Sequence, residues 1–255
     1  MRLTYLDSNS WSIEIAGVKV LLDPWLVGSL VFGNLPWLFK GTRRKSRSIP
    51  TDIDLILLSQ GLEDHAHPPT LEQLNRSLPV VGSANAANVV EKLGYTDVTA
   101  LSHRQIYTFG DRLQIQAVPG SPIGPTTVEN GYVLTDLQTG TRLYYEPHGY
   151  HDAFLKEIGS IDVVITPIVN LELPLVGAFI KGQQSALEVV KWLKPTYILP
   201  TAAGGDVDFE GLLISILRAS GTTDTFSTLL AQNDLNTEVI DPPPGEPIEL
   251  EVRRR

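Results

Sequence analysis

The sequence has no cysteine and a single methionine among its 255 residues. Without cysteine there is no disulfide and no thiolate ligand, so a zinc-type site would have to be built from histidines and carboxylates. Histidine is scarce as well. The chain has five, at His65, His67, His103, His148 and His151. Any metal site therefore has few candidate ligands.

Long apolar runs are also missing. No run reaches the ~18 residues that a membrane-spanning helix needs, and residues 1–10 lack the apolar core of a signal peptide. Acidic residues outnumber basic ones by 29 to 20, which gives a net charge of −9, and a field of that sign repels nucleic-acid backbones. We therefore expect a soluble, cytoplasmic protein that binds a small-molecule substrate or ligand and no nucleic acid. The oligomeric state cannot be read from the sequence.

The hydrophobic content of 42% is enough for one large core. Apolar runs and turn signals predict strands at 2–6, 12–16, 18–22, 55–58, 79–82, 104–109, 113–118, 132–135, 142–145, 163–165 and 197–199. Helical patterns fall at 70–76, 83–93, 184–193 and 209–219. The simplest assembly is a single α/β domain over 1–255 with α+β layering, a four-layer αββα sandwich. The proline-rich residues 241–255 predict a stiff linker and a C-terminal edge strand.

Residues 25–50 are predicted to form an insertion or flap. They are apolar, are broken by glycine and proline, and end in a basic cluster of Arg43, Arg44, Lys45 and Arg47. Three interpretations are open: a flap packed on the core, a lid over a substrate pocket, and an interfacial membrane anchor. In the last, which is not the favoured one, four aromatic side chains would enter lipid: Trp25, Phe32, Trp37 and Phe39.

The most informative stretch runs from Leu55 to Thr70. Its first four residues are apolar and have the length of a buried strand, and a turn rich in proton-transferring and metal-binding groups follows at once. Asp64, His65 and His67 lie in this turn. Chemistry in α/β proteins is usually placed at the end of a strand, so the turn is the candidate active site.

This turn resembles the signature loop of the metallo-β-lactamase superfamily, in which a buried strand ends in Thr/Ser-His-x-His-x-Asp-His. Here Ser59 to His65 read Ser-Gln-Gly-Leu-Glu-Asp-His, so the closing Asp64-His65 pair is kept while Gln60 and Leu62 replace the two earlier histidines. The Leu-Asp-Pro step at 22–24 is similar to the branch of small zinc-dependent hydrolases related to ascorbate-phosphate lactonase. Where that branch commonly has Gly-His, this chain has Asp-Ser-Asn-Ser at 7–10. The resemblance covers most of the chain from residue 3 to about residue 205.

The resemblance implies a four-layer sandwich and an altered metal site. Members of the superfamily hold two zinc ions, and here the ligands of the first ion are lost. The second site keeps Asp64 and His65, and Glu146 and His148 follow a strand near the place of the bridging aspartate. The last histidine of the second site is replaced, because Thr201 stands there. A dinuclear site is not expected. The four remaining residues would bind one zinc or other divalent ion.

Such an ion would lower the pKa of a bound water and produce a hydroxide nucleophile. This implies a divergent hydrolase of a small ester, lactone or phosphoester with Asp64 and His65 as catalytic residues. Two metal-free alternatives are open. In one, Asp64 caps a helix near Pro68 or braces the loop backbone, and His65 and His67 bind backbone carbonyls. In the other, an imidazole activates water while His151 or the basic cluster steadies an anion.

The alternative to the hydrolase interpretation is that the chain is a binding or scaffold protein, which keeps the fold but has lost catalysis. In one version of this alternative, the protein lies at a membrane surface. The alternative predicts either that Gln60 and Leu62 fill the former metal cavity or that the pocket holds a ligand without converting it. The remaining histidine, His103, precedes a predicted strand in a polar context and is expected at the surface or in a turn.

Overall fold

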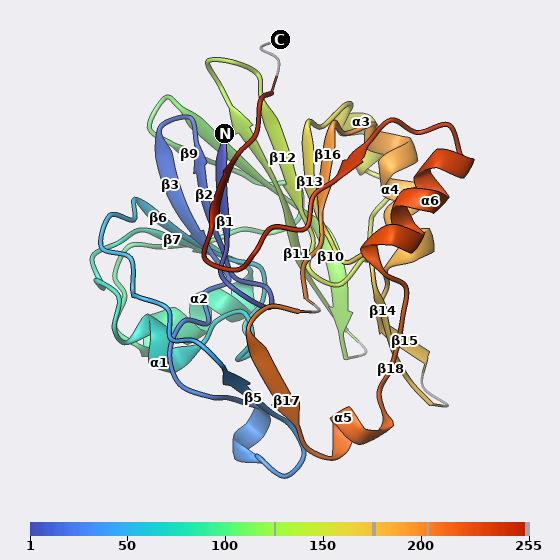
Figure 1. Cartoon of the computed structure of the whole chain (residues 1–255). Helices are drawn as coiled ribbons and strands as arrows, with labels where there is room; N and C mark the ends of the chain where they lie inside the picture. Colours follow the sequence, from blue (N-terminus) through green and yellow to red (C-terminus); the bar gives the residue numbers. More distant parts are fainter. Residues whose placement is uncertain (125, 175–176, 203, 253–255) are drawn as a thin grey trace. The chain divides into compact units, whose positions relative to one another are not determined.

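The computed structural model describes residues 1–124, 126–174, 177–202 and 204–252. Its contacts divide the chain into two compact units (Figure 1). Unit 1 comprises Met1–Ser102, Gly204–Ile216 and Pro242–Leu250, and unit 2 comprises His103–Ala203, Leu217–Asp241 and Glu251–Arg255. The expectation of a single domain over 1–255 stays a prediction. The end of the expected C-terminal segment, 253–255, lies outside the described residues.

Unit 1 is built on a seven-stranded sheet with the strand order β20-β1-β2-β3-β6-β7-β8. These strands are β20 (Pro247–Glu249), β1 (Arg2–Tyr5), β2 (Trp11–Ile15), β3 (Val18–Leu22), β6 (Leu55–Leu58), β7 (Val80–Gly82) and β8 (Val98–Ala100). β2 and β3 form the predicted hairpin, whose turn residues Ala16 and Gly17 both have a positive φ, 56° and 65°. β20 pairs with β1 at the sheet's edge, as expected for the C-terminal segment.

The strand β6 lies between β3 and β7, parallel to both, and all four of its residues are buried. A continuous apolar run suits a strand that is covered on both faces. Because β3 and β6 are parallel, the loops that follow them leave the sheet at the same edge. This register places the residue after Leu22 beside the turn that follows Leu58.

The helices α1 (Pro68–Leu71) and α2 (Ala84–Lys92) lie beside β6 and β7 (Figure 1). The side chain of Ser83 caps α2 by accepting a hydrogen bond from the Ala86 amide at 3.3 Å. The helices and strands share one apolar core: Leu21, Leu26, Ile53, Ile56, Leu58, Ala66, Leu71, Leu74, Val80, Ala86, Val90 and Tyr95. α1 is shorter than the predicted 70–76 helix.

The predicted flap supplies two strands of a small sheet with the order β17-β5-β4. The flap contributes β4 (Leu30–Val31), the 3-10 turn η1 (Phe32–Asn34) and β5 (Lys40–Arg43), and a later part of the chain contributes β17 (Val207–Glu210) and the short helix α5 (Leu212–Ile216). A second apolar cluster forms here from Trp25, Leu30 and Val207, with Phe32, Phe39 and Phe209 packed against it. The 25–50 segment is thus packed within unit 1, whereas Trp37 is 63% exposed.

The helix predicted at 209–219 is present only as the short α5. These residues end β17, form α5 and begin β18 (Arg218–Ser220). Gly211 separates the first two with φ 113°, and a Cβ there would lie 2.6 Å from the carbonyl oxygen of Leu38. Pairing of Phe209 with Gly41 across β5 overrides the local helical preference.

Unit 2 is built on a sheet in the order β19-β16-β13-β12-β11-β10-β9. These strands are β19 (Glu238–Val239), β16 (Tyr197–Leu199), β13 (Val163–Ile165), β12 (Arg142–Tyr145), β11 (Thr127–Asp136), β10 (Leu113–Ile123) and β9 (Ile106–Phe109). A smaller sheet joins β14 (Asn170–Leu173), β15 (Gly177–Ile180) and β18.

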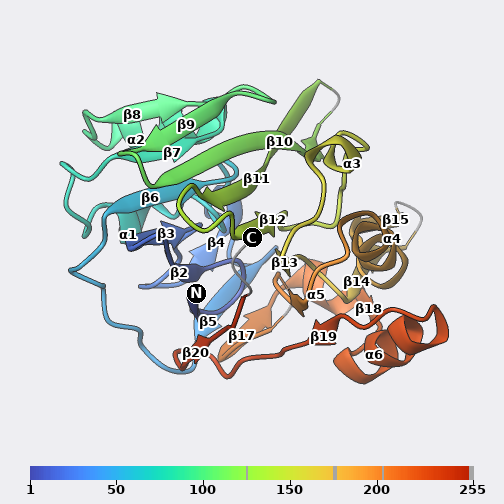
Figure 2. The same cartoon turned by 90° about the horizontal axis from the view of Figure 1, so that it is seen from above.

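Three helices lie along the larger sheet of unit 2: α3 (Leu155–Ile158), α4 (Gln183–Leu193) and α6 (Thr223–Gln232). α4 and α6 lie side by side (Figure 2). They bury an apolar face that includes Leu187, Val190 and Phe226 against sheet residues such as Val164 and Ile198. Within the described ranges, the helices are all too short or too polar to cross a lipid bilayer.

Candidate functional site

The candidate site in unit 1 is organised by Asp23, the residue that follows β3. Its carboxylate is fully buried. One oxygen, Oδ1, accepts a hydrogen bond from the Ser59 amide at 2.7 Å, and Oδ2 accepts one from the Ser59 hydroxyl at 2.5 Å. The parallel pairing of β3 with β6 brings these two loop residues together. A buried carboxylate with these partners is satisfied and held in one orientation.

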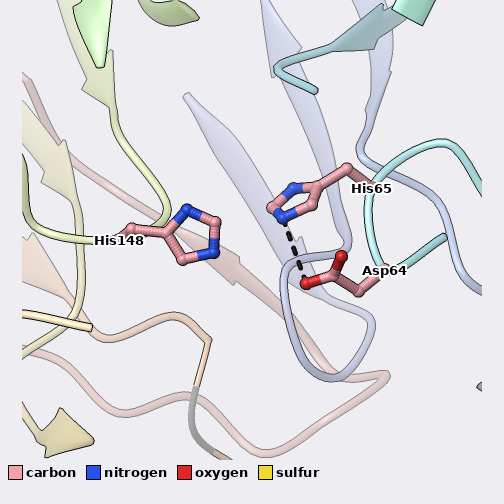
Figure 3. A group of neighbouring side chains, drawn as sticks. All are labelled: Asp64, His65 and His148. Carbon is pink, nitrogen blue, oxygen red and sulfur yellow. Dashed lines mark ion pairs between the residues drawn. The ribbon is translucent and has the colours of Figure 1, made fainter. Parts of the chain in front are cut away.

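The same carboxylate holds His65. The imidazole is fully buried, its Nδ1 lies 2.7 Å from Asp23 Oδ2, and its Nε2 lies 3.1 Å from Asp64 Oδ2 (Figure 3). Burial disfavours the charged ring, but the carboxylates of Asp64 and Asp23 outweigh it and raise the pKa of His65 to about 10. Without a metal, the ring is therefore an imidazolium between two carboxylates at neutral pH.

A tight turn at 7–10 brings a third polar group to this pair. Asn9 is buried, and its Nδ2 lies 3.4 Å from Asp64 Oδ2 and 3.4 Å from His65 Nε2. Asp7 and Ser8 in the turn have φ of 77° and 53°, a left-handed conformation that costs a non-glycine residue about 1–2 kcal/mol. Strong contacts elsewhere in the turn must offset this cost.

The basic cluster supplies those contacts. The guanidinium of Arg43 is nearly buried and pairs with Asp7, and burial lowers the pKa of Arg43 although Asp7 opposes the shift. Arg47 also binds Asp7, at 2.9 Å, and Asp206, at 2.9 Å. The two more exposed members are paired too: Arg44 lies 2.6 Å from Asp208 and Lys45 lies 3.3 Å from Asp206. All four predicted basic residues thus have carboxylate partners within unit 1.

The other two predicted site residues lie in unit 2, after β12. The buried carboxylate of Glu146 accepts hydrogen bonds at Oε2 from the backbone amides of His148, at 3.0 Å, and Tyr150, at 2.8 Å. The half-buried His148 ring lies with Nδ1 3.0 Å from the Ser121 hydroxyl. Glu146 therefore braces the loop that presents His148. The convergence of these residues with Asp64 and His65 stays a prediction.

The remaining histidines have structural partners. One metal-free alternative named His151 as a group that could steady an anion, and this stays a prediction; burial, with a smaller effect from Lys181, lowers the pKa of His151 to about 3. Its neutral ring lies with Nδ1 3.0 Å from the Tyr144 hydroxyl. His67 Nδ1 contacts the Thr70 hydroxyl at 3.0 Å, and burial lowers the pKa of His67 to about 4. His103 lies in a turn, as expected.

Asp64 does not cap α1, so that expectation is wrong: His67 is the residue at the N-cap, and it makes no side-chain capping bond. The expectation of the binding-protein alternative that Gln60 and Leu62 fill the former metal cavity stays a prediction. Gln60 is 1% exposed, whereas Leu62 is 38% exposed. Of the two replacements for the signature histidines, Gln60 alone lies inside the protein.

The structure brings together Asp64 and His65 and adds three partners that the site prediction omitted: Asn9, Asp23 and Ser59. Asp23 had a detectable signal, since the Leu-Asp-Pro step directly follows a strand. Asn9 had only its place in the turn at 7–10. Neither contact could be inferred by spacing, because these residues lie 42 and 56 positions before His65.

Two donor atoms in unit 1 have a separation that suits shared metal binding. Ligand atoms of a tetrahedral zinc site with bonds of about 2.0–2.1 Å are about 3.3 Å apart, and Asp64 Oδ2 and His65 Nε2 are 3.1 Å apart. Asp23 on Nδ1 fixes the ring in the way that second carboxylates orient metal-bound histidines. These two residues are half of a usual ligand set, and Glu146 and His148 are the further ligands predicted from the sequence.

Known proteins share both the sequence pattern and the fold. A family model described as the beta-lactamase superfamily domain matches residues 2–202. A UPF0173 metal-dependent hydrolase from Carboxydothermus hydrogenoformans is 26% identical over 215 residues, covering 78% of this chain and 83% of that protein. Another, from Methanopyrus kandleri, is 23% identical over 263 residues, covering 98% and 100%.

Two solved structures match nearly the whole chain. Igni18, a metallo hydrolase from Ignicoccus hospitalis, has a TM-score of 0.70 at 18% identity and covers 99% of both chains. An isothiocyanate hydrolase from Delia radicum gut bacteria has a TM-score of 0.69 at 16% identity, covering 98% of this chain and 99% of that one. The expected fold class is confirmed, with two mixed sheets and their helices. On the match over residues 2–202, the chain belongs to the metallo-β-lactamase superfamily.

Proposed function

We propose that the protein is a metal-dependent hydrolase with a reduced, single-metal site, and that it acts on a small ester, lactone or phosphoester. One observation carries the proposal: Asp23 fixes His65 so that Nε2 lies 3.1 Å from the Asp64 carboxylate. Two donor atoms at that separation suit one divalent ion. The curated relatives support the reaction class, since they are named metal-dependent hydrolases.

Each residue has a defined part in this proposal. Asp64 and His65 bind the ion, Asp23 holds the imidazole in one orientation, and Glu146 and His148 complete the ligand set as the sequence predicts. His65 must release its Nε2 proton to solvent before it binds a metal, because a ligating imidazole is neutral and Asp64 must stay ionised to bind the same ion. A bound divalent ion would supply a water of lowered pKa as the nucleophile.

The test is hydrolysis of a panel of simple carboxylic esters, lactones and phosphodiesters after loading with zinc or manganese. Asp64→Asn and His65→Gln keep the side-chain volumes and should lower kcat/KM by at least about 100-fold. His103→Gln is the matched control, because His103 lies in a turn of unit 2 with Nε2 3.1 Å from the Val128 carbonyl oxygen. Equal loss in the control, or activity that survives both site variants, would contradict the proposal.

The second candidate is a non-catalytic binding protein. Its support is that the charges of the cluster are paired without a metal, because the His65 imidazolium lies between the carboxylates of Asp23 and Asp64. The buried Gln60 is a poor zinc ligand in place of a signature histidine. This candidate predicts that the loaded protein hydrolyses no member of the panel. Its membrane-peripheral version predicts sedimentation with anionic vesicles that weakens with salt and with loss of Arg43, Arg44 and Lys45.

A further inference from the structure

The turn at 7–10 is fixed from one side by a buried ion cluster. The Asp7 carboxylate is fully buried and accepts hydrogen bonds from Arg43 Nη1, from Arg47 Nε at 2.9 Å, from Arg47 Nη2 at 3.1 Å and from the Asp206 amide at 2.7 Å. The side chains of Arg43 and Arg47 are 5% and 12% exposed. A carboxylate with this many donors has little freedom to rotate.

Arg43 also holds the chain on both sides of the site. Its Nη2 donates to the carbonyl oxygens of Leu6, at 2.8 Å, and Trp25. Leu6 precedes the turn, and Trp25 comes two residues after Asp23. The guanidinium lies 4.9 Å from the centre of the Trp25 ring. A planar fork with several fixed donors can join these groups, and a lysine ammonium cannot.

Ser10, at the other end of the turn, connects the turn to the residues that follow β3. Its hydroxyl donates to the Asp23 carbonyl oxygen at 2.9 Å and accepts from the Trp25 amide at 2.8 Å. Asp23, on the Nδ1 side of His65, is therefore tied to the same turn that carries Asn9 to the Nε2 side. One rigid turn sets both neighbours of the imidazole.

We propose that Asn9 is a positioning residue for the Asp64–His65 pair, and that Arg43 and Arg47 act on it through Asp7. Asn9 Nδ2 donates a hydrogen bond to Asp64 Oδ2 at 3.4 Å and lies 3.4 Å from His65 Nε2, so it keeps this carboxylate oxygen beside the imidazole. In this proposal the basic cluster of the predicted flap stabilises the turn that carries Asn9. The effect of Asn9 on metal binding rests on the proposed function, but its contacts with Asp64 and His65 also exist without a metal.

The first readout is the affinity for Co²⁺, which is measured by visible absorption while the full chain is titrated with Co²⁺. Asn9→Ala should weaken binding by about 10-fold or more, the range reported for groups that orient metal ligands. Arg43→Lys should weaken it in the same direction. Arg44→Lys is the matched control: Arg44 belongs to the same cluster, but it is 58% exposed and pairs with Asp208. The Co²⁺ affinity of Arg44→Lys should stay within about twofold of that of the unmodified protein.

The second readout needs no metal. The imidazole ¹⁵N and ¹H resonances of His65 report on ring contacts in the apoprotein, and Asn9→Ala and Arg43→Lys should shift them while Arg44→Lys does not. Should the unmodified protein bind no Co²⁺, the proposed function fails and the inference is decided by these resonances alone. Where Arg43→Lys fails to fold, Arg47→Lys takes its place. Unchanged His65 resonances in Asn9→Ala would overturn the inference, as would equal shifts in Arg44→Lys.

Discussion

Replacing Asp23 with asparagine tests whether the buried cluster stabilises unit 1. The substitution keeps the side-chain volume but puts an amide in place of a carboxylate that binds Ser59 through both oxygens and His65 at 2.7 Å. In one amide orientation an NH₂ group faces the Ser59 hydroxyl and the His65 ring, and in the other it faces the Ser59 amide donor. Each orientation leaves a buried donor without an acceptor.

The expected magnitude follows from the burial of both partners. Removing one member of a buried ion pair typically costs about 3–5 kcal/mol. Both His65 and Asp23 are fully buried, so solvent screening gives no discount. For a chain of this size, such a loss lowers Tm by roughly 6–20 °C. Urea and thermal unfolding, followed by circular dichroism and by tryptophan fluorescence, measure both quantities.

Asp52→Asn is the matched control. Asp52 also pairs with a cation in unit 1, with Lys19 Nζ at 2.7 Å, but its side chain is 71% exposed. An exposed pair of this kind contributes little, so the control should unfold like the unmodified protein. If Asp23→Asn costs less than about 1 kcal/mol, the reasoning that this pair is buried and charged is refuted.

Three further predictions concern the scaffold. Ser83→Ala removes the cap of α2 and should cost about 1 kcal/mol in urea unfolding. Gly182→Ala should cost at least about 2 kcal/mol, because its Cβ would lie 2.4 Å from the carbonyl carbon of Ile168, and near-unmodified stability would contradict the packing. Burial, with Lys181, lowers the pKa of His151 from 6.5 to about 3. Between pH 6.5 and pH 3 the unfolded chain therefore binds a proton at His151 that the folded protein does not bind, so the free energy of unfolding falls by up to about 1.4 kcal/mol per pH unit as the pH is lowered. His151→Gln should reduce this pH dependence when unfolding is measured at pH 7, 5.5 and 4.5.

Regular elements with a clear local signal were predictable from the sequence. The apolar runs 55–58, 142–145, 163–165 and 197–199 are strands with these bounds. The helix after Ser83 begins where its capping residue indicates. In each case the local pattern and the tertiary environment favour the same structure.

Elements that depend on distant partners were not predictable. The first two residues of the 209–219 segment, Phe209 and Glu210, pair as part of a strand with β5, which lies more than 150 residues earlier, and this pairing limits the helix to α5. The helix α6 was missed although Thr222 caps it, because its capping box uses Thr225 in place of the usual glutamate or glutamine.

The residues of the candidate site also differ in whether a local sequence pattern indicates them. Asp64 and His65 are adjacent in a motif, and the sequence alone identified them. Asn9 and Asp23 reach them through the 7–10 turn and the β3–β6 register, which no local pattern reveals. The basic cluster is the clearest case, since the sequence shows four cations but not the buried carboxylate of Asp7 that binds two of them.

The most direct test of the single-metal claim is elemental analysis of tag-free protein, loaded with zinc or manganese and then dialysed. We predict about one equivalent of divalent metal in the unmodified protein and less than about 0.1 equivalent in Asp64→Ala and His65→Ala. Less than about 0.1 equivalent in the unmodified protein, or metal retained by both variants, would contradict it.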